Sequence, residues 1–306
     1  MYKNIYLKHR KEESLKRFHP WVFSGAIHHM DEGIAEGDTV RVITADGNCI
    51  AVGHYQLGTI TVRVLSFDDI AIDDSFWQQR IQSALAMRES IGVANNPDNN
   101  TYRLIHGEGD NLPGLIIDCY GTTAVMQAHS VGMHVCREQI CKALIEVMGD
   151  RIKNVYYKSE TTLPFKAELG QENGFIYGHT DNNTAVENSL SFHVDWLKGQ
   201  KTGFFVDQRE NRSLLEHYAK GKSVLNMFCY TGGFSVYAMR GGANIVHSVD
   251  SSAKAIELTN HNVAMNFPND NRHEAFCEDA FKYLDENDKK YDLIVLDPPA
   301  FAKHRM

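Results

Sequence analysis

Four acidic or glycine-rich segments in the last third of the sequence carry residue types that recognise a nucleoside. Each follows a short apolar run of the kind that forms a buried strand. They are Phe228-Cys229-Tyr230-Thr231-Gly232-Gly233, Asp250-Ser251, Glu278-Asp279-Ala280 and Asp297-Pro298-Pro299. In an open parallel sheet, ligands bind beyond the carboxyl ends of the strands. The four segments therefore predict a single ligand site.

The first three segments suit the parts of a nucleoside cofactor. Gly232 and Gly233 let the backbone approach a ligand without an intervening Cβ. A carboxylate at Asp250, eighteen residues after Gly232, can accept hydrogen bonds from both ribose hydroxyls. An acid at Asp279 can meet the exocyclic amine of an adenine. We therefore expect these residues to bind a cofactor: Phe228, Cys229, Tyr230, Thr231, Gly232, Gly233, Asp250, Ser251, Asp279 and Ala280.

A nicotinamide dinucleotide enzyme is the main alternative for this arrangement. Its G-x-G-x-x-G loop is needed to bind a pyrophosphate at a helix start. Here the loop has only the adjacent pair Gly232-Gly233. A nucleoside cofactor without phosphate explains why the acids are present and the phosphate loop is not. S-adenosylmethionine (SAM) is such a cofactor, and the pattern favours it.

Asp297-Pro298-Pro299 predicts the substrate end of the site. Two consecutive prolines fix φ twice and remove two backbone donors, so this segment is a rigid loop that cannot continue a sheet. The Asp297 carboxylate can bind the amine edge of a flipped-out base, and the proline carbonyls can accept hydrogen bonds. We therefore expect Asp297, Pro298 and Pro299 to form the catalytic centre. The alternative is a simple turn that ends a strand.

The segment 201–212, ahead of the first strand, has two interpretations. Asp207 with Glu210 three residues later predicts a capping box at the start of a helix that leads to His217. Capping leaves Gln208 and Arg212 unexplained. They lie one helical turn apart and could face the amino-acid end of the cofactor.

Strands and helices alternate in the region that positions these residues. We expect strands at 224–228, 244–249, 275–277 and 293–296. Helices are expected to begin at Phe234, at Ser251 or Ser252, and at Phe281, and the second should stop at Pro268. This alternation predicts a doubly wound α/β fold.

Two other regions precede this one. Apolar and polar residues alternate from Thr39 to Leu65 around Asp46-Gly47, which predicts a β-hairpin in a small all-β barrel. Next, a helix at 73–90, a hairpin of strands 115–119 and 123–128, a helix at 133–148 and a strand at 155–157 predict a mixed α/β unit. The polar loop His106–Asp110 is interpreted as structural.

Composition limits the class of protein. The chain has 306 residues, 43% of them hydrophobic, and lacks an apolar run long enough for a membrane span or secretory signal. Six scattered cysteines suggest neither a zinc site nor disulfides, so we expect no metal, no membrane contact and a cytoplasmic location. The net charge of -8 weighs against nucleic acid. However, residues 1–19 are locally basic, which allows an RNA-binding face.

Several long strings resemble the ribosomal RNA large-subunit methyltransferase I family. They are residues 19–27 (HPWVFSGAI), 102–115 (YRLIHGEGDNLPGL), 201–212, 226–235 and 297–301. The resemblance implies three domains. These are a PUA-like RNA-binding barrel at 1–70, a mixed α/β middle domain at 71–185, and a class I, Rossmann-like methyltransferase domain at 186–306.

The resemblance also implies an activity. It indicates SAM-dependent formation of 5-methylcytosine in ribosomal RNA. A homodimer is one alternative for the oligomeric state, which the sequence does not decide. The family's methyltransferase sheet has seven strands, and its nucleophilic cysteine is expected beyond Met306, so the chain is interpreted as truncated. Cys229 is not assigned that role, because a small thiol in a cofactor loop is usually buried. Methylation of an amine, and an RNA-binding module without activity, stay open as alternatives.

Overall fold

The computed structural model describes residues 2–164, 169 and 172–298. The chain divides into two compact units, Met1–Asn182 and Asn183–Met306. Pro299, one of the expected catalytic residues, lies outside the described residues. No helix in the described part of the chain is long and apolar enough to cross a membrane.

Unit 1 begins with a six-stranded sheet in the order β2-β6-β5-β4-β1-β3. Strands β1 and β4 pair in parallel, and the other neighbours are antiparallel. The predicted hairpin is confirmed, with Gly47 in its turn at φ +85°. The elements are β1 (Lys3–Leu7), α1 (Glu13–Lys16), β2 (Trp21–Phe23), η1 (Ser24–Ala26), β3 (Ile27–Met30), β4 (Thr39–Ile43), β5 (Cys49–Tyr55) and β6 (Ile60–Ser66).

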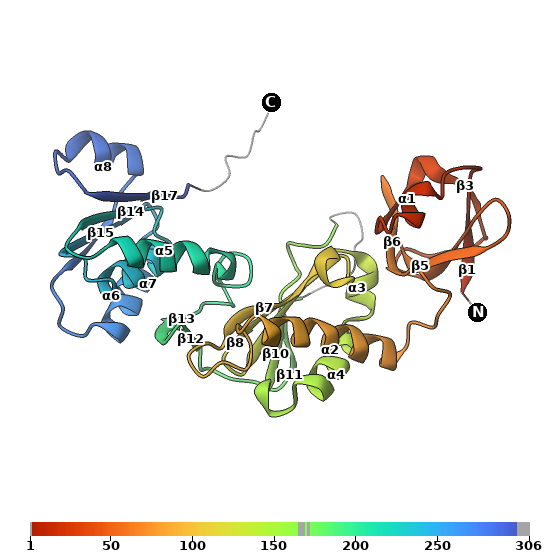
Figure 1. Ribbon diagram of the computed structural model, residues 1–306, viewed down its shortest axis with the longest axis horizontal. Coiled ribbons are helices and arrows are strands. Elements are labelled where there is room, and N and C mark those ends of the chain that lie inside the picture. Colours follow the sequence, from red (N-terminus) through yellow and green to blue (C-terminus); the bar gives the residue numbers. More distant parts are fainter. Residues whose placement is uncertain (1, 165–168, 170–171, 299–306) are drawn as a thin grey trace. The chain divides into compact units, whose positions relative to one another are not determined.

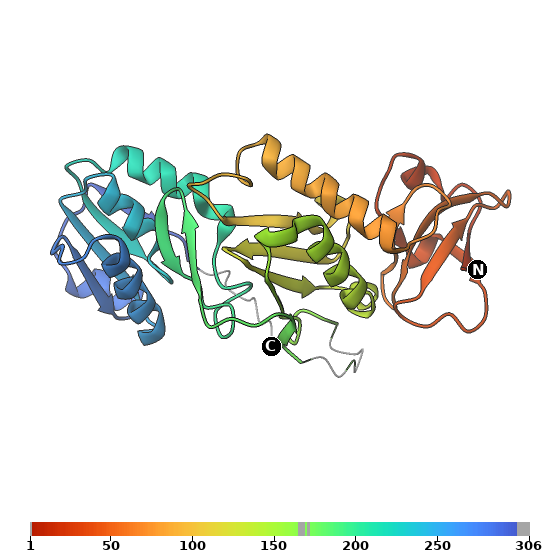
Figure 2. The ribbon, with the colours of Figure 1, turned by 90° about the horizontal axis from the view of Figure 1, so that it is seen from below.

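The second part of unit 1 is a five-stranded sheet in the order β11-β10-β9-β8-β7, with helices packed on it (Figure 2). Trp77 and Ile81 of α2 and Leu144 of α4 share one buried cluster with Ile117 of β8. The elements are α2 (Asp74–Ser90), β7 (Thr101–His106), η2 (Gly107–Asp110), β8 (Leu115–Tyr120), β9 (Thr123–Ala128), α3 (Val131–Val135), α4 (Arg137–Met148), η3 (Gly149–Arg151), β10 (Asn154–Tyr157) and β11 (Gly174–Tyr177).

Two predictions for this part need correction. The single helix expected at 133–148 is two helices, because the backbone leaves helical geometry at Cys136, which ends α3 and precedes α4. The segment 101–106, for which no strand was expected, forms β7 against β8. The start of α2 is as expected, since the Asp73 side chain accepts a hydrogen bond from the Phe76 N–H.

Unit 2 contains a four-stranded parallel sheet in the order β16-β15-β14-β17. A two-stranded hairpin, β12 and β13, precedes it and was not predicted. The elements are β12 (Thr184–Glu187), β13 (Leu190–His193), η5 (Val206–Gln208), α5 (Arg209–Tyr218), β14 (Ser223–Met227), α6 (Gly233–Arg240), β15 (Ile245–Asp250), α7 (Ala253–Asn266), β16 (His273–Cys277), α8 (Ala280–Glu286) and β17 (Leu293–Leu296).

Helices cover both faces of this sheet, which confirms the doubly wound fold. Leu225 and Met227 of β14 pack against Tyr283 of α8. The intervening Asn226 points to the other face, where its Nδ2 donates to the Ser235 Oγ of α6 (2.9 Å). Figure 1 shows α8 on one side of the strands and α6 and α7 on the other.

The expected capping box at Asp207 and Glu210 is wrong. The chain first makes the 3-10 turn η5, and α5 then begins at Arg209 with Gln208 as its N-cap, without any side-chain cap. Asp207 lies inside the turn, one residue too early to cap the helix. In contrast, Ser252 caps α7 as expected, accepting from the Ala255 N–H.

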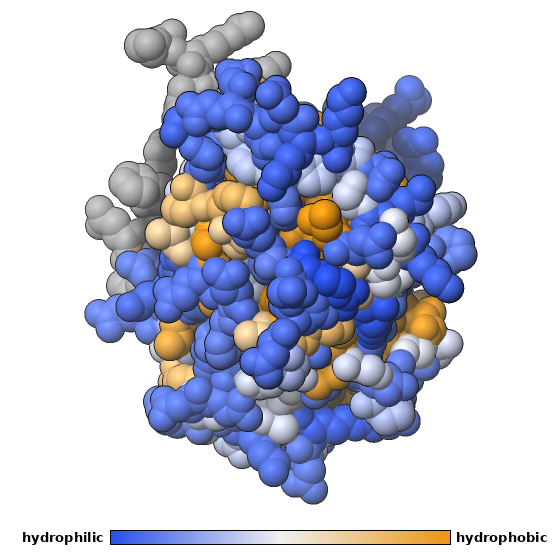
Figure 3. All heavy atoms as spheres, turned by 90° about the vertical axis from the view of Figure 1, so that its left-hand side faces the viewer, coloured by the Kyte–Doolittle hydropathy of each residue, from blue (hydrophilic) through white to orange (hydrophobic). Residues whose placement is uncertain are grey.

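The surface of unit 2 carries scattered apolar side chains. Among the described residues, the exposed large ones are Leu197, Leu214, Tyr218, Ile245, Phe281, Leu284, Ile294 and Leu296. In Figure 3 the hydrophobic areas on the face shown are separated by hydrophilic residues.

Candidate cofactor site

The sheet order brings the four predicted segments to one edge. In the parallel registers, Met227 of β14 pairs with Val249 of β15 and Leu296 of β17, and Asp250 pairs with Cys277 of β16. The residues that follow the strands therefore form a row. Asp279 and Asp250 lie on one side of the Phe228–Gly233 loop, and Asp297 lies on the other. At parallel-strand spacing the row spans roughly 14 Å.

The Phe228–Gly233 loop, called the cofactor loop below, has an unusual backbone. Phe228, Tyr230 and Gly232 all have positive φ, at +57°, +49° and +73°. Non-glycine residues rarely adopt this conformation, and it persists where surrounding contacts hold it in place. Gly232 is also crowded, since a Cβ there would lie 2.7 Å from the Thr259 Cγ2.

Asp250 fixes the cofactor loop to the neighbouring strand end. Its Oδ2 accepts from the Tyr230 N–H (3.0 Å) and its Oδ1 from the Ser252 N–H (2.9 Å). A carboxylate has about four acceptor positions, so two amide donors leave room for two ribose hydroxyls. The half-buried carboxylate is thus held in place and able to accept further hydrogen bonds, which fits a ribose.

Helix α7 supplies two contacts that the sequence did not reveal. The Thr259 hydroxyl donates to the Tyr230 carbonyl (3.1 Å), and the Asn262 Nδ2 donates to the Thr231 carbonyl (2.8 Å). Both side chains are fully buried. Their three-residue spacing on the same face as Ala255 and Val263 was the available signal, because polar residues on a buried helix face need partners.

Cys229 is packed inside the cofactor loop. Its side chain is buried, and its Sγ lies 3.4 Å from the Thr259 Oγ1. Burial raises the pKa of the thiol to about 12. Because the reactive form is the thiolate, Cys229 is unsuited to act as a nucleophile near neutral pH.

Arg212 is anchored by contacts within the fold. Its guanidinium forms a bidentate ion pair with Glu187 of β12 (2.8 and 2.7 Å) and donates to the Phe205 carbonyl (3.0 Å). Both charged side chains are buried, and the Tyr237 hydroxyl also donates to Glu187 (2.9 Å). Glu187 was not predicted as a site residue. This pair joins α5 to the hairpin, so we propose that Arg212 positions the loop ahead of α5 rather than contacting cofactor.

Gln208, its expected companion, is half-buried at the start of α5. Its Oε1 accepts from the Asn211 Nδ2 (2.7 Å). The preceding segment is tied to the cofactor loop through Tyr230, whose hydroxyl donates to the Gly203 carbonyl (3.2 Å) and accepts from the Gln200 N–H (3.0 Å). This link places the segment beside the cofactor loop.

Asp279 is exposed and caps helix α8. Its Oδ1 accepts from the Phe281 and Lys282 N–H groups at 2.9 and 3.2 Å. The strand end is tied to its neighbour, since the Glu278 N–H donates to the Asp250 carbonyl (3.0 Å). Ala280 is half-buried as the first residue of α8, and Ser251 is exposed beside Asp250.

Asp297 and Pro298 follow β17 and are exposed. The β14–β17 register places them next to the start of the cofactor loop. An exposed carboxylate beside that loop is available to a ligand that approaches from solvent.

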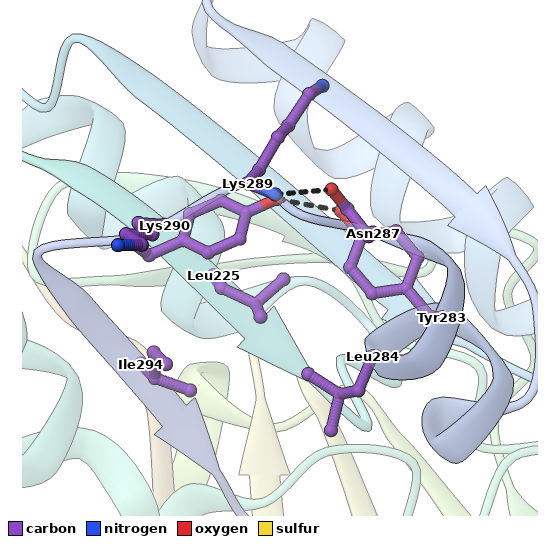
Figure 4. Close-up of a pocket in the computed structure, with 8 residues that line it drawn as sticks. Leu225, Tyr283, Leu284, Asn287, Lys289, Lys290 and Ile294 are labelled. Carbon is purple, nitrogen blue, oxygen red and sulfur yellow. Dashed lines mark hydrogen bonds between the residues drawn. The ribbon is translucent and has the colours of Figure 1, made fainter.

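A hollow of about 370 Å³ lies elsewhere in unit 2, on the α8 face of the sheet. Figure 4 shows Leu225, Leu284 and Ile294 in it, with Lys289 and Lys290 at its edge. The Tyr283 and Tyr291 hydroxyls are hydrogen-bonded there (2.7 Å). Leu225 and Ile294 lie in the middle of their strands, so this hollow is separate from the strand-end row.

Comparison with known families agrees with this geometry. The S-adenosylmethionine-dependent methyltransferase family matches residues 175–306, and the PUA-like domain family matches residues 5–67. A protein from Streptococcus mutans assigned as a SAM-dependent methyltransferase superposes with a TM-score of 0.81 at 25% identity, covering 98% of this chain and 77% of that one. The chain is therefore a SAM-dependent methyltransferase with a PUA-like N-terminal domain.

The relatives narrow this class further. The ribosomal RNA large subunit methyltransferase I of Alteromonas mediterranea is 38% identical over 98% of this chain and 76% of its own length. The enzyme of the same name from Shewanella amazonensis is 39% identical over 98% of this chain and 77% of its own length. The chain belongs to the ribosomal RNA large subunit methyltransferase I family. A similar crystal structure is that of a protein assigned as a methyltransferase, in complex with S-adenosylhomocysteine (SAH). It superposes with a TM-score of 0.83 at 25% identity, covering 99% of this chain and 78% of that one.

Proposed function

We propose that this chain transfers a methyl group from SAM to carbon 5 of a cytosine in large-subunit ribosomal RNA, in the cytoplasm. The observation that carries the proposal is the Asp250 carboxylate, held against the cofactor loop by the Tyr230 and Ser252 amides. The RNA substrate is supported by the names of the relatives and by the PUA-like domain.

The residues of the site divide between cofactor and substrate. Asp250 would hold the ribose hydroxyls, and the cofactor loop would lie along the nucleoside. Asp279 would meet the adenine edge through the carboxylate oxygen that does not cap α8. When bound, SAM supplies a methyl group on a positively charged sulfur. Asp297 and Pro298, on the other side of the loop, would orient the target base.

Positioning is the main contribution that these residues can make. Holding two reactants in line raises the rate by avoiding the loss of translational and rotational freedom at the moment of reaction. The bonded ends of β14 and β15 and the rigid Asp297-Pro298 segment suit that task. Addition of a thiolate to carbon 6 would activate carbon 5. After methyl transfer, loss of the carbon-5 proton would release the thiolate again. The buried Cys229 thiol, with its pKa raised to about 12, does not supply that thiolate, so the proposal requires a different cysteine for this step.

The test is incubation of this chain with SAM carrying a labelled methyl group and unmodified large-subunit ribosomal RNA. Nucleosides are then separated by chromatography and identified by mass spectrometry. The expected product is 5-methylcytosine, at a level that Asp297→Ala reduces at least tenfold. Label on an exocyclic amine would contradict the carbon-5 assignment. No label, under conditions where RNA and SAH both bind, would favour an RNA-binding module without activity.

A further inference from the structure

A second hollow, of about 510 Å³, lies on the six-stranded sheet of unit 1. It is bounded by the end of β1 and the residues after it, by β3, and by the turn between β4 and β5. Its chemically distinctive lining residues are Tyr6, Lys8, His9, His28 and His29. None of the described residues that line it is an aspartate or glutamate. We call it the barrel hollow.

Two aromatic rings that line the barrel hollow are stacked on each other. Tyr6 of β1 and His29 of β3 are direct partners in the antiparallel register. Their rings are stacked, with centroids 4.2 Å apart and an angle of 9° between the planes. The His28 ring lies edge-on to His29, with centroids 5.0 Å apart. Both histidines are exposed and Tyr6 is half-buried, so solvent can reach the stacked pair.

The same hollow has a basic edge. Lys8 is exposed, and its ammonium donates to the Gly25 carbonyl (3.0 Å), which keeps the charge near the rim. An ammonium carries three donors, so this contact leaves two for another acceptor. Exposed Arg10 and Lys11 follow His9 directly in the sequence. Lys8 therefore gives the hollow a positive charge on a chain whose net charge is -8.

Aromatic rings beside a cation form a combination that binds unpaired nucleotides. Nucleobases stack on aromatic side chains, and cations neutralise the adjoining phosphates. The volume of the barrel hollow falls within the range of small-ligand sites. We propose that the barrel hollow binds one unpaired nucleotide of a single-stranded RNA segment, with its base stacked on an outer face of the Tyr6–His29 pair and its phosphate beside Lys8. The RNA class of the ligand rests on the proposed function, whereas the location rests on the hollow itself.

Fluorescence anisotropy of a labelled single-stranded RNA decamer, measured with the full chain, tests this proposal. We expect Tyr6→Leu to weaken binding about fivefold or more, because a stacking surface is lost, and Tyr6→Phe to bind like the original chain. Lys8→Ala should weaken binding and reduce the slope of log affinity against log salt by about 1. Lys142→Ala, at an exposed lysine of α4, removes the same charge elsewhere and should leave binding unchanged.

Cross-linking provides an independent readout. RNA that contains 4-thiouridine should cross-link to peptides that include residues 6–9 or 28–29. If Tyr6→Leu and Lys8→Ala bind the decamer like the original chain, or if all cross-links fall outside these peptides, the proposal is overturned.

The two proposals can fail separately. If Tyr6→Leu methylates ribosomal RNA and binds the decamer like the original chain, the barrel-hollow proposal is overturned and the proposed methyltransferase function is unaffected. If Tyr6→Leu loses decamer binding but the original chain methylates no RNA, the barrel-hollow proposal is supported and the proposed function is contradicted. Unchanged SAH affinity in Tyr6→Leu would show that unit 2 is intact.

Discussion

At the scale of single residues, Gly232 combines a positive φ with close packing. Its φ is +73° and a Cβ would lie 2.7 Å from the Thr259 Cγ2. Gly221 also has φ +73°, but no atom lies within 4 Å of its Cβ position. Comparing alanine variants at the two positions therefore distinguishes the effect of backbone strain from the effect of crowding.

Gly232→Ala should weaken SAH binding about tenfold or more, because the cofactor loop must shift away from α7. Gly221→Ala carries only the strain of the left-handed backbone, about 1–2 kcal/mol of stability, and should leave SAH affinity unchanged. Isothermal titration calorimetry on both variants checks this. Equal SAH affinities in the two variants would show that crowding at Gly232 does not control the loop.

Cys229 gives a prediction about pH. A thiol whose pKa is raised stays protonated, and unreactive, at every pH well below its new value. With the Cys229 pKa raised to about 12, iodoacetamide at pH 8 should leave it unmodified in the folded chain while the exposed Cys277 reacts. Mass spectrometry of the digested protein measures both sites. Rapid modification of Cys229 at pH 8 would contradict the buried assignment.

The sequence pointed to acids at strand ends, since position after an apolar run is a local pattern. It could not identify the partners of Thr259, Asn262 or Glu187, which lie far away in the chain. Likewise, the spacing of Arg212 from Gln208 gave no sign that Glu187 is its buried partner.

At the scale of elements, the buried Glu187–Arg212 pair joins the hairpin to α5. Glu187→Gln leaves the buried Arg212 guanidinium, and the Arg209 guanidinium 3.4 Å from Glu187, without their charged partner, which costs about 3–5 kcal/mol of unfolding free energy. Glu216 pairs with Arg240 at side-chain exposures of 25% and 29%. Glu216→Gln should cost less, about 1 kcal/mol or below. Urea unfolding followed by circular dichroism compares the two, and equal losses would argue against a special role for the buried pair.

Periodicity located most elements and missed some of their boundaries. The strand at Leu293–Leu296 and the hairpin around Gly121 agree with expectation, because apolar runs and turn residues are local signals. The break at Cys136 does not follow from apolar periodicity, which continues through it. The turn before Arg209 does not follow from the capping-box spacing of Asp207 and Glu210. The pairing of β7 with β8 likewise depends on long-range packing.

At the scale of the whole molecule, composition indicated a chain without a membrane span, but the net charge gave no sign of a local basic surface. A net charge of -8 argues against nucleic acid, yet a basic, aromatic hollow lies on one sheet of unit 1. Averages over the chain conceal such local surfaces. The sequence predicted a doubly wound α/β fold but not its strand order. The order β16-β15-β14-β17 places Asp250 and Asp297 on opposite sides of the cofactor loop.

The central claim, that the strand-end row of unit 2 binds the cofactor through Asp250, is tested most directly by calorimetric titration of SAH into the original chain and Asp250→Asn. The asparagine keeps the shape and replaces one acceptor oxygen by a donor. Because hydrogen bonds to charged groups contribute about 1.5–3 kcal/mol, affinity should fall about tenfold or more. The exposed Asp288→Asn, with the same charge change, should bind like the original chain. No SAH binding by the original chain, or equal affinity in Asp250→Asn, would contradict the account.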